Sequence, residues 1–69
     1  MRVGILGGGQ LARMLALAAA PLGMRVRVYD PGADVSASAV AEHVRGSWGD
    51  TGALARFCDG LDLATVEFE

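Results

Sequence analysis

The sequence predicts an α/β fold in which helices flank a parallel sheet, and three observations favour this class. A short aliphatic run, Val3 to Leu6, ends in three glycines, which is typical of a strand buried on both faces. From Gln10 onward, apolar residues recur at steps of three and four, the spacing of a helix. A second strand is then indicated from Val26 to Tyr29. Strand, helix and strand in this order form a right-handed crossover between parallel strands.

The first strand is expected to be central in the sheet, and the helix that follows is expected to pack on one sheet face. The residues predicted to face the sheet are those that share the helical spacing: Leu11, Met14, Leu15, Ala18 and Leu22. Pro21 and Gly23 end the helix because proline and glycine both disfavour its continuation. The turn sequence Asp30-Pro31-Gly32 ends the second strand.

The second half of the chain carries a weaker pattern. Residues 33–42 are rich in small side chains and are expected to form a loop and a short helix, followed by a brief strand within 43–47. Asp50 can cap a helix expected over Thr51 to Asp59, which Gly60 ends. The apolar residues of this helix are Leu54, Ala55, Phe57 and Cys58. Leu63 to Phe68 is expected to be a further parallel strand.

Composition restricts the function classes. The 69 residues are 52% hydrophobic and carry six arginines, no lysine and eight acidic residues, a net charge of −2. A chain without a basic stripe is not expected to bind nucleic acid. Its apolar runs are too short to cross a membrane, and the single cysteine, Cys58, can form no internal disulfide, so a cytoplasmic location is expected. Because Leu63 to Glu69 end without a cap or turn, we expect an incomplete, truncated domain.

The segment Gly7-Gly8-Gly9-Gln10-Leu11-Ala12 fits G-x-G-x-x-A between a strand and a helix, which indicates a Rossmann-like nucleotide site. Glycines let the backbone approach a ligand, and the helix start offers N–H groups and a partial positive charge to an anion. Asp30 lies at the distance expected for a ribose-binding carboxylate. Alternatively, the glycines only allow close packing of strand and helix. Gln10 argues against NAD, because dinucleotide loops usually place a small or apolar residue near the pyrophosphate.

Other candidate residues carry weaker predictions. Arg13 is expected to be solvated, although it could reach an anionic ligand, and His43 is expected to be a surface or cap residue without a metal role. Cys58 is expected to be a buried, inert thiol. Trp48 could serve packing or an interface. Glu67 and Glu69 point to opposite faces of a strand, so one of them at most can face a ligand at the glycine loop.

At this point the sequence resembles a known family. The string ILGGGQLARMLALAAAPLG, the VYDP turn, the AEHV segment at 41–44 and the ending CDGLDLATVEFE together are similar to the N-terminal domain of the 5-(carboxyamino)imidazole ribonucleotide synthase (PurK) family of ATP-grasp enzymes. The resemblance covers nearly the whole chain. Ala12 stands where the family commonly has glycine, and it is small enough for the same strand–helix contact.

The resemblance implies that residues 1–69 are an incomplete pre-ATP-grasp, Rossmann-like domain of an enzyme whose ATP-grasp and C-terminal domains lie downstream. Such an enzyme uses ATP and bicarbonate, through carboxyphosphate, to carboxylate aminoimidazole ribonucleotide, and a homodimer is expected for the full-length protein. The residues that the resemblance assigns to the ribonucleotide are Gly9, Gln10, Leu11 and Glu67. ATP and magnesium would be bound by the downstream domains, and the present chain alone is expected to be inactive.

Two other functions stay open at this stage. The glycine motif with Asp30 would by itself favour an NAD(P)-binding domain of an oxidoreductase. A noncatalytic nucleotide-binding regulatory module is the third interpretation. Gln10 and the T-x-E-F-E ending at 65–69 favour the ligase over the oxidoreductase.

Overall fold

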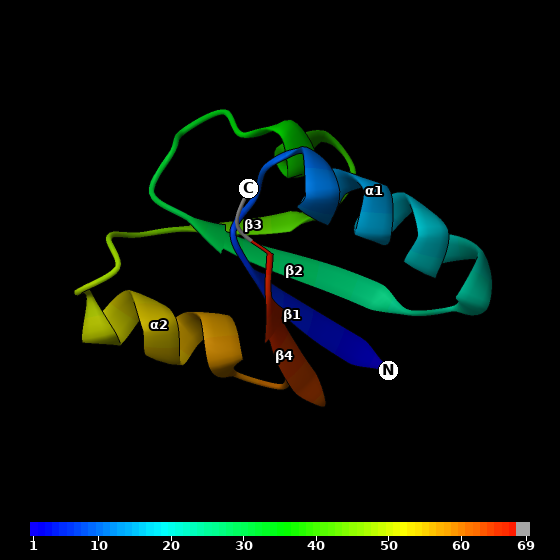
Figure 1. Cartoon of the computed structure of the whole chain (residues 1–69). Helices are drawn as coiled ribbons and strands as arrows, with labels where there is room; N and C mark the ends of the chain where they lie inside the picture. Colours follow the sequence, from blue (N-terminus) through cyan, green and yellow to red (C-terminus); the bar gives the residue numbers. More distant parts are fainter. Residues whose placement is uncertain (68–69) are drawn as a thin grey trace.

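The computed structural model describes residues 1–67 and contains a four-stranded sheet with helices on both faces (Figure 1). The strands are β1 (Arg2–Leu6), β2 (Arg25–Asp30), β3 (Glu42–Arg45) and β4 (Leu63–Val66). The α-helices are α1 (Gln10–Ala19) and α2 (Thr51–Cys58), and two short 3₁₀ helices are η1 (Ala20–Leu22) and η2 (Ser36–Ala39). The predicted elements are thus present, with the last strand ending at Val66; Phe68 and Glu69 lie outside the described residues.

All strand pairs are parallel, in the order β3-β2-β1-β4. β1 pairs with β2 through Val3 opposite Val26 and with β4 through Leu6 opposite Val66. The prediction that the first strand is central is therefore confirmed. Because the strands are parallel, the carboxyl ends of β1, β2 and β4 lie at one edge of the sheet, directly before α1 and the other connections.

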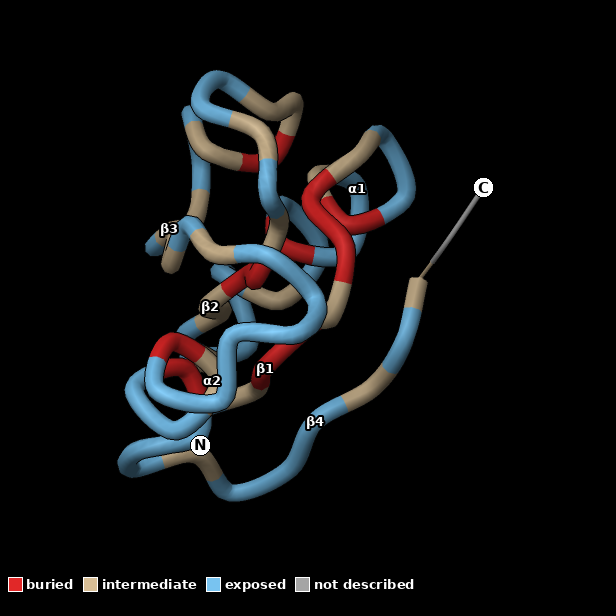
Figure 2. Tube along the Cα trace, turned by 90° about the vertical axis from the view of Figure 1, so that its left-hand side faces the viewer, coloured by how far each residue is buried: buried red, intermediate tan, exposed pale blue. Residues whose placement is uncertain are grey.

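Two hydrophobic clusters cover the two faces of the sheet. On the α1 face, Ile5 and Val28 pack with Ala12 of the helix and Ala37 of η2. On the α2 face, Tyr29 packs with Ala53 and Phe57. Ile5 and Leu6, like Val28 and Tyr29, alternate between the clusters because successive strand residues point to opposite faces. In Figure 2 the buried segments follow β1, β2 and the inner sides of both helices, whereas β4 is mostly exposed.

The prediction of which residues of α1 face the sheet is wrong. Ala12 and Ala16 are buried, whereas Leu11, Met14 and Leu15 are 41%, 57% and 42% exposed, and Ala18 and Leu22 are exposed as well. The glycine loop brings the helix so close to β1 and β2 that alanines, rather than leucines, fit between them. Both sets of residues have helical spacing, so the pattern alone did not distinguish them. The predicted contact of Ala12 with the sheet is confirmed.

The predicted buried position of Cys58 is also wrong, since this thiol is exposed. α2 begins after Asp50, whose carboxylate accepts a hydrogen bond from the Ala53 N–H at 3.0 Å as predicted. Its buried residues are Ala53 and Phe57, which lie four positions apart on one helix face. Cys58 follows Phe57 by about 100° around the helix. It therefore points away from the sheet, as does the exposed Ala55.

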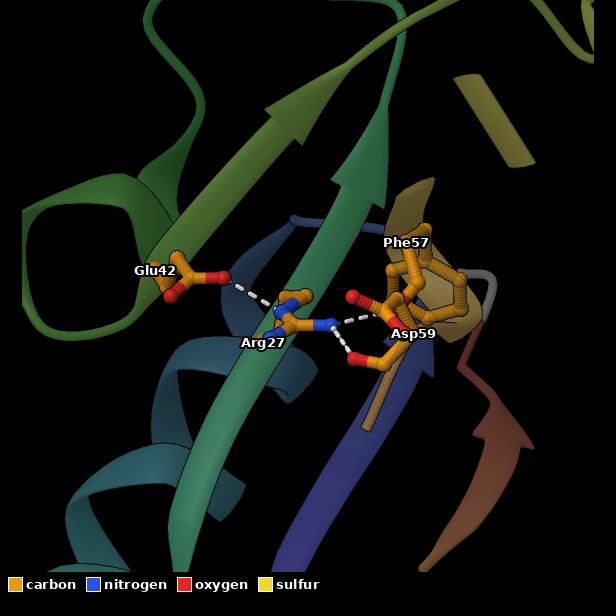
Figure 3. A network of polar contacts seen from close by, with 4 residues as sticks. All are labelled: Arg27, Glu42, Phe57 and Asp59. Carbon is orange, nitrogen blue, oxygen red and sulfur yellow. Dashed lines mark hydrogen bonds and ion pairs between the residues drawn. The ribbon is translucent and has the colours of Figure 1, made fainter. Parts of the chain in front are cut away.

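Arg27 holds the end of α2 against the sheet. Its Nη1 donates hydrogen bonds to the carbonyl oxygens of Phe57 at 2.7 Å and Asp59 at 2.6 Å. Its Nε donates to Glu42 at the start of β3, forming an ion pair (Figure 3). The last carbonyls of a helix have no partner within the helix. The Arg27 side chain supplies one and links β2, β3 and α2.

Candidate functional site

The candidate site is the glycine-rich loop, residues 7–9, at the carboxyl edge of the sheet. Gly7 has a φ of 113°, a conformation that side chains disfavour, and its N–H donates to the Tyr29 carbonyl at 2.8 Å. Gly9 precedes the first residue of α1 and makes no side-chain cap within the described residues. The loop therefore turns directly from β1 into α1 and presents the positive end of the helix at this edge.

Asp30 holds this loop in place. One carboxylate oxygen accepts a hydrogen bond from the Gly8 N–H at 3.0 Å, and the other accepts from the Gly32 N–H at 2.9 Å. Both oxygens of the carboxylate thus accept hydrogen bonds from backbone N–H groups in or near the glycine loop. This differs from the ribose-binding role that the G-x-G-x-x-A spacing predicts for Asp30, because a ribose would have to compete with two backbone amides.

Gly8 serves close packing in addition. A Cβ atom at Gly8 would lie 2.6 Å from Val35 Cγ2, closer than real side-chain contacts allow. The Gly8 carbonyl also accepts a hydrogen bond from the Ala37 N–H at 2.9 Å. The packing role considered for the glycines therefore applies to Gly8, while Gly9 lies at the helix start.

Gln10 is exposed at the first position of α1, and its side-chain oxygen accepts a hydrogen bond from Ser36 Oγ at 3.0 Å. With its oxygen engaged, the amide group keeps its two N–H donors for a ligand. Sequence reasoning missed Ser36, because no local pattern relates η2 to a helix that begins 26 residues earlier.

Glu67 follows β4, and its backbone N–H donates to the Leu6 carbonyl at 3.1 Å. Since Leu6 directly precedes the glycine loop, the end of β4 lies beside the end of β1, from which this loop starts. Gly9 follows in the loop, and Gln10 and Leu11 follow in the first turn of α1. Glu69, the other carboxylate of this segment, lies outside the described residues.

The remaining candidates lie elsewhere or serve the fold. The Nε2 atom of His43 lies 3.1 Å from the Asp30 carbonyl oxygen, so this half-buried ring packs at the end of β2. Trp48 packs on Tyr29 with ring centroids 5.4 Å apart and is 45% exposed. Arg13 is half-buried in the first turn of α1. Among residues 1–67, no three His, Cys, Asp or Glu side chains lie where they could hold a metal ion.

Tyr29 is a buried titratable group whose surroundings shift its pKa. Burial raises its pKa, the nearby Asp50 carboxylate raises it further, and Arg56 lowers it in part. Its hydroxyl donates to the Ser47 carbonyl, and its ring also packs on Phe57 at a centroid distance of 5.6 Å. The phenol is fully buried beneath the loop that follows β3. Tyr29 therefore stabilises the fold and does not belong to the site.

A parallel sheet, a glycine loop that leads into a helix, and an acidic residue beside this loop are typical of one class of protein, the α/β domains that bind a ligand at the carboxyl edge of their strands. The comparison with protein families supports this class over residues 1–69, where the model of the ribonucleotide synthetase preATP-grasp domain matches. The chain belongs to this family.

Curated relatives and solved structures agree with this assignment. The chain is 49% identical over 69 residues to the N5-carboxyaminoimidazole ribonucleotide synthase of Pseudomonas aeruginosa, covering all of the chain and 19% of that protein. It is 47% identical over 68 residues to the bifunctional purine synthesis protein purC/E of Dictyostelium discoideum, covering 97% of the chain and 7% of that protein. The chain thus spans at most about a fifth of these relatives.

Two crystal structures have the same fold over nearly the entire chain. The N5-carboxyaminoimidazole ribonucleotide synthetase of Thermus thermophilus matches with a TM-score of 0.94 and 57% identity over 97% of this chain and 19% of that one. The Staphylococcus aureus N5-carboxyaminoimidazole synthetase, complexed with ADP, matches with a TM-score of 0.90 and 38% identity. This match covers 97% of the present chain and 18% of that one. The predicted parallel α/β fold and the resemblance to this enzyme family are confirmed.

Over residues 1–67 the structure contains no helix of the length and apolar character that crossing a membrane requires.

Proposed function

We propose that residues 1–69 are the substrate-binding N-terminal part of an ATP-dependent ligase that carboxylates aminoimidazole ribonucleotide with bicarbonate in de novo purine biosynthesis. The observation that carries the proposal is the meeting of the glycine loop and Glu67 at one edge of the sheet, in a chain whose relatives are named as synthases of the carboxylated ribonucleotide. The NAD(P)-binding and regulatory alternatives are not favoured by these relatives.

In this proposal the chain binds and orients the ribonucleotide. Gly9 lets the substrate approach the positive end of α1, and the Gln10 amide donates to a substrate oxygen, with Ser36 fixing its orientation. Leu11 packs against the substrate in the first helical turn. Glu67 accepts hydrogen bonds from substrate hydroxyl groups across the loop. The role of this segment is thus to present the exocyclic amine for carboxylation.

The domain organisation is part of the same proposal. Residues 1–69 form an incomplete pre-ATP-grasp domain, and downstream ATP-grasp and C-terminal domains bind ATP and magnesium. We further propose that the full-length enzyme is a cytoplasmic homodimer.

The test uses the full-length ligase that carries residues 1–69. Gln10→Ala and Glu67→Ala should each raise the KM for aminoimidazole ribonucleotide about tenfold, the effect of one lost hydrogen bond to a polar or charged group, and should change the KM for ATP less than about twofold. Arg56→Ala, an exposed position on α2, is the matched control and should change neither constant. Equal effects of Gln10→Ala and Glu67→Ala on both KM values would refute the proposed site.

A further inference from the structure

A second candidate site lies at the opposite edge of the sheet from the glycine loop. A cavity of about 420 Å³ opens where β1, β2 and β3 begin, next to the last turns of α1. Its lining includes Arg2 and Arg25 at the starts of β1 and β2, Glu42 at the start of β3, and Ala20 after α1. Cavities that bind small molecules usually have volumes of about 300 to 1,000 Å³, so this one is large enough for a ligand.

The cavity concentrates positive charge in a chain of net charge −2. Three of the six arginines, Arg2, Arg25 and Arg27, line it. Arg2 and Arg25 lie directly opposite each other in the register of β1 and β2. Arg27 is two residues further along β2 and therefore lies on the same sheet face. The two positive charges repel each other, and an anion bound between them would relieve this repulsion.

Within residues 1–67 the protein compensates only one of these three charges. Glu42, the acidic residue of the lining, pairs with Arg27, which also bonds to the two carbonyls at the end of α2 (Figure 3). The guanidinium groups of Arg2 and Arg25 make no hydrogen bond or ion pair in this part of the chain. The Asp62 carboxylate accepts from the Arg2 backbone N–H at 2.6 Å but does not line the cavity. Two positive charges thus remain available at its wall.

The rest of the cavity lining is mostly apolar. Val26 lies on the α1 face of the sheet, and Leu61 lies on the α2 face, which is the face of the three arginines. A ligand that fills the cavity therefore needs an anionic group at one end and a compact apolar body at the other.

We propose that this cavity binds a phosphate monoester whose phosphate lies between Arg2 and Arg25. Guanidinium groups bind phosphate through paired hydrogen bonds, and the two negative charges of a monoester above its second pKa match the two arginines. The apolar body of the ester lies against Leu61, which lies on the same face of the sheet as the three arginines. This site is separate from the glycine loop, and the proposal does not depend on the ligase activity.

Isothermal titration calorimetry on the full-length protein tests the site, with phenyl phosphate as the probe at about pH 8, where the monoester is a dianion. We expect a saturable binding component whose Kd rises about tenfold or more in Arg2→Gln and in Arg25→Gln, because each substitution removes charge-assisted hydrogen bonds to the phosphate. Arg56→Gln removes the same charge from the exposed face of α2 and should leave this Kd within about twofold of its unsubstituted value. Phenyl phosphate bound at other sites is unaffected by Arg2→Gln and Arg25→Gln, so the difference isolates the cavity.

Three outcomes would overturn the proposal. The first is a titration without a component that depends on Arg2 or Arg25 in variants whose circular dichroism matches that of the unsubstituted protein. The second is an equal loss in Arg56→Gln, which would mean nonspecific attraction by net charge. The third is an equal Kd for inorganic phosphate, which would assign the site to the free anion instead of an ester.

Discussion

Removing the Asp30 carboxylate should destabilise the domain, because this side chain holds the glycine loop. Asp30→Ala deletes the hydrogen bonds to Gly8 and Gly32 and leaves the N–H of the buried Gly8 without its acceptor. A hydrogen bond to a charged group contributes about 1.5 to 3 kcal/mol. Because Asp30 is half-buried and water can replace part of the loss, we expect the free energy of unfolding to fall by about 2 to 4 kcal/mol for the two bonds together.

This loss is large in comparison with native domains, in which 69 residues correspond to a total stability of about 3 to 10 kcal/mol. Asp30→Asn is the milder variant. Its amide oxygen can still accept from one of the two N–H groups, whereas its NH₂ group faces the other donor. We therefore expect Asp30→Asn to lose about half as much as Asp30→Ala, about 1 to 2 kcal/mol.

Urea denaturation followed by Trp48 fluorescence measures these differences, since Trp48 packs on the buried Tyr29 and should report the loss of this contact. Asp34→Ala is the matched control, because Asp34 is an exposed aspartate of the same connection and should change stability by less than about 0.5 kcal/mol. If Asp30→Ala proved as stable as Asp34→Ala, Asp30 would not hold the loop. If Asp30→Ala in addition abolished saturable NAD binding, the ribose-binding role would be correct.

Three further predictions concern ligands, activity and pH. NAD and NADP should show no saturable binding to the full-length protein at about millimolar concentration, because backbone amides engage Asp30 and the Gln10 side chain lies at the start of α1, where a pyrophosphate would bind; micromolar binding would favour an oxidoreductase. The 69-residue chain, incubated with ATP, magnesium, bicarbonate and aminoimidazole ribonucleotide, should release no ADP, because the groups that hold magnesium and the ATP phosphates for phosphoryl transfer are proposed to lie in the downstream domains; release that Glu67→Ala abolishes would contradict this. Burial raises the pKa of Tyr29 above 10.0, so the folded state favours the neutral phenol, and its stabilising contribution is complete below about pH 10 and declines as pH rises further. The urea midpoint should therefore fall less steeply above about pH 10 in Tyr29→Phe than in the unsubstituted chain, and identical slopes would refute the assignment.

The sequence by itself determined the order and type of the elements. The change from an aliphatic run to helical spacing at the glycines predicted β1, the loop and α1, and Asp50 correctly marked the start of α2. These features depend on the backbone preferences and caps of neighbouring residues, which a local pattern records. The same patterns, with the resemblance, placed Gly9 and Gln10 at the start of α1.

Only the tertiary structure decided which side chains meet. Alanines and leucines of α1 share the same helical spacing, and the close approach of the helix to β1 selected Ala12 and Ala16 for the interior. The Asp30 carboxylate accepts hydrogen bonds from backbone N–H groups, and the Arg27 side chain donates to a carbonyl at the end of α2, 30 residues away in the sequence. The pairing of β4 with β1 places the Glu67 backbone next to Leu6, which precedes the glycine loop. Such contacts depend on how strands pair and helices pack. Their partners lie too far apart in the sequence for local spacing to encode them.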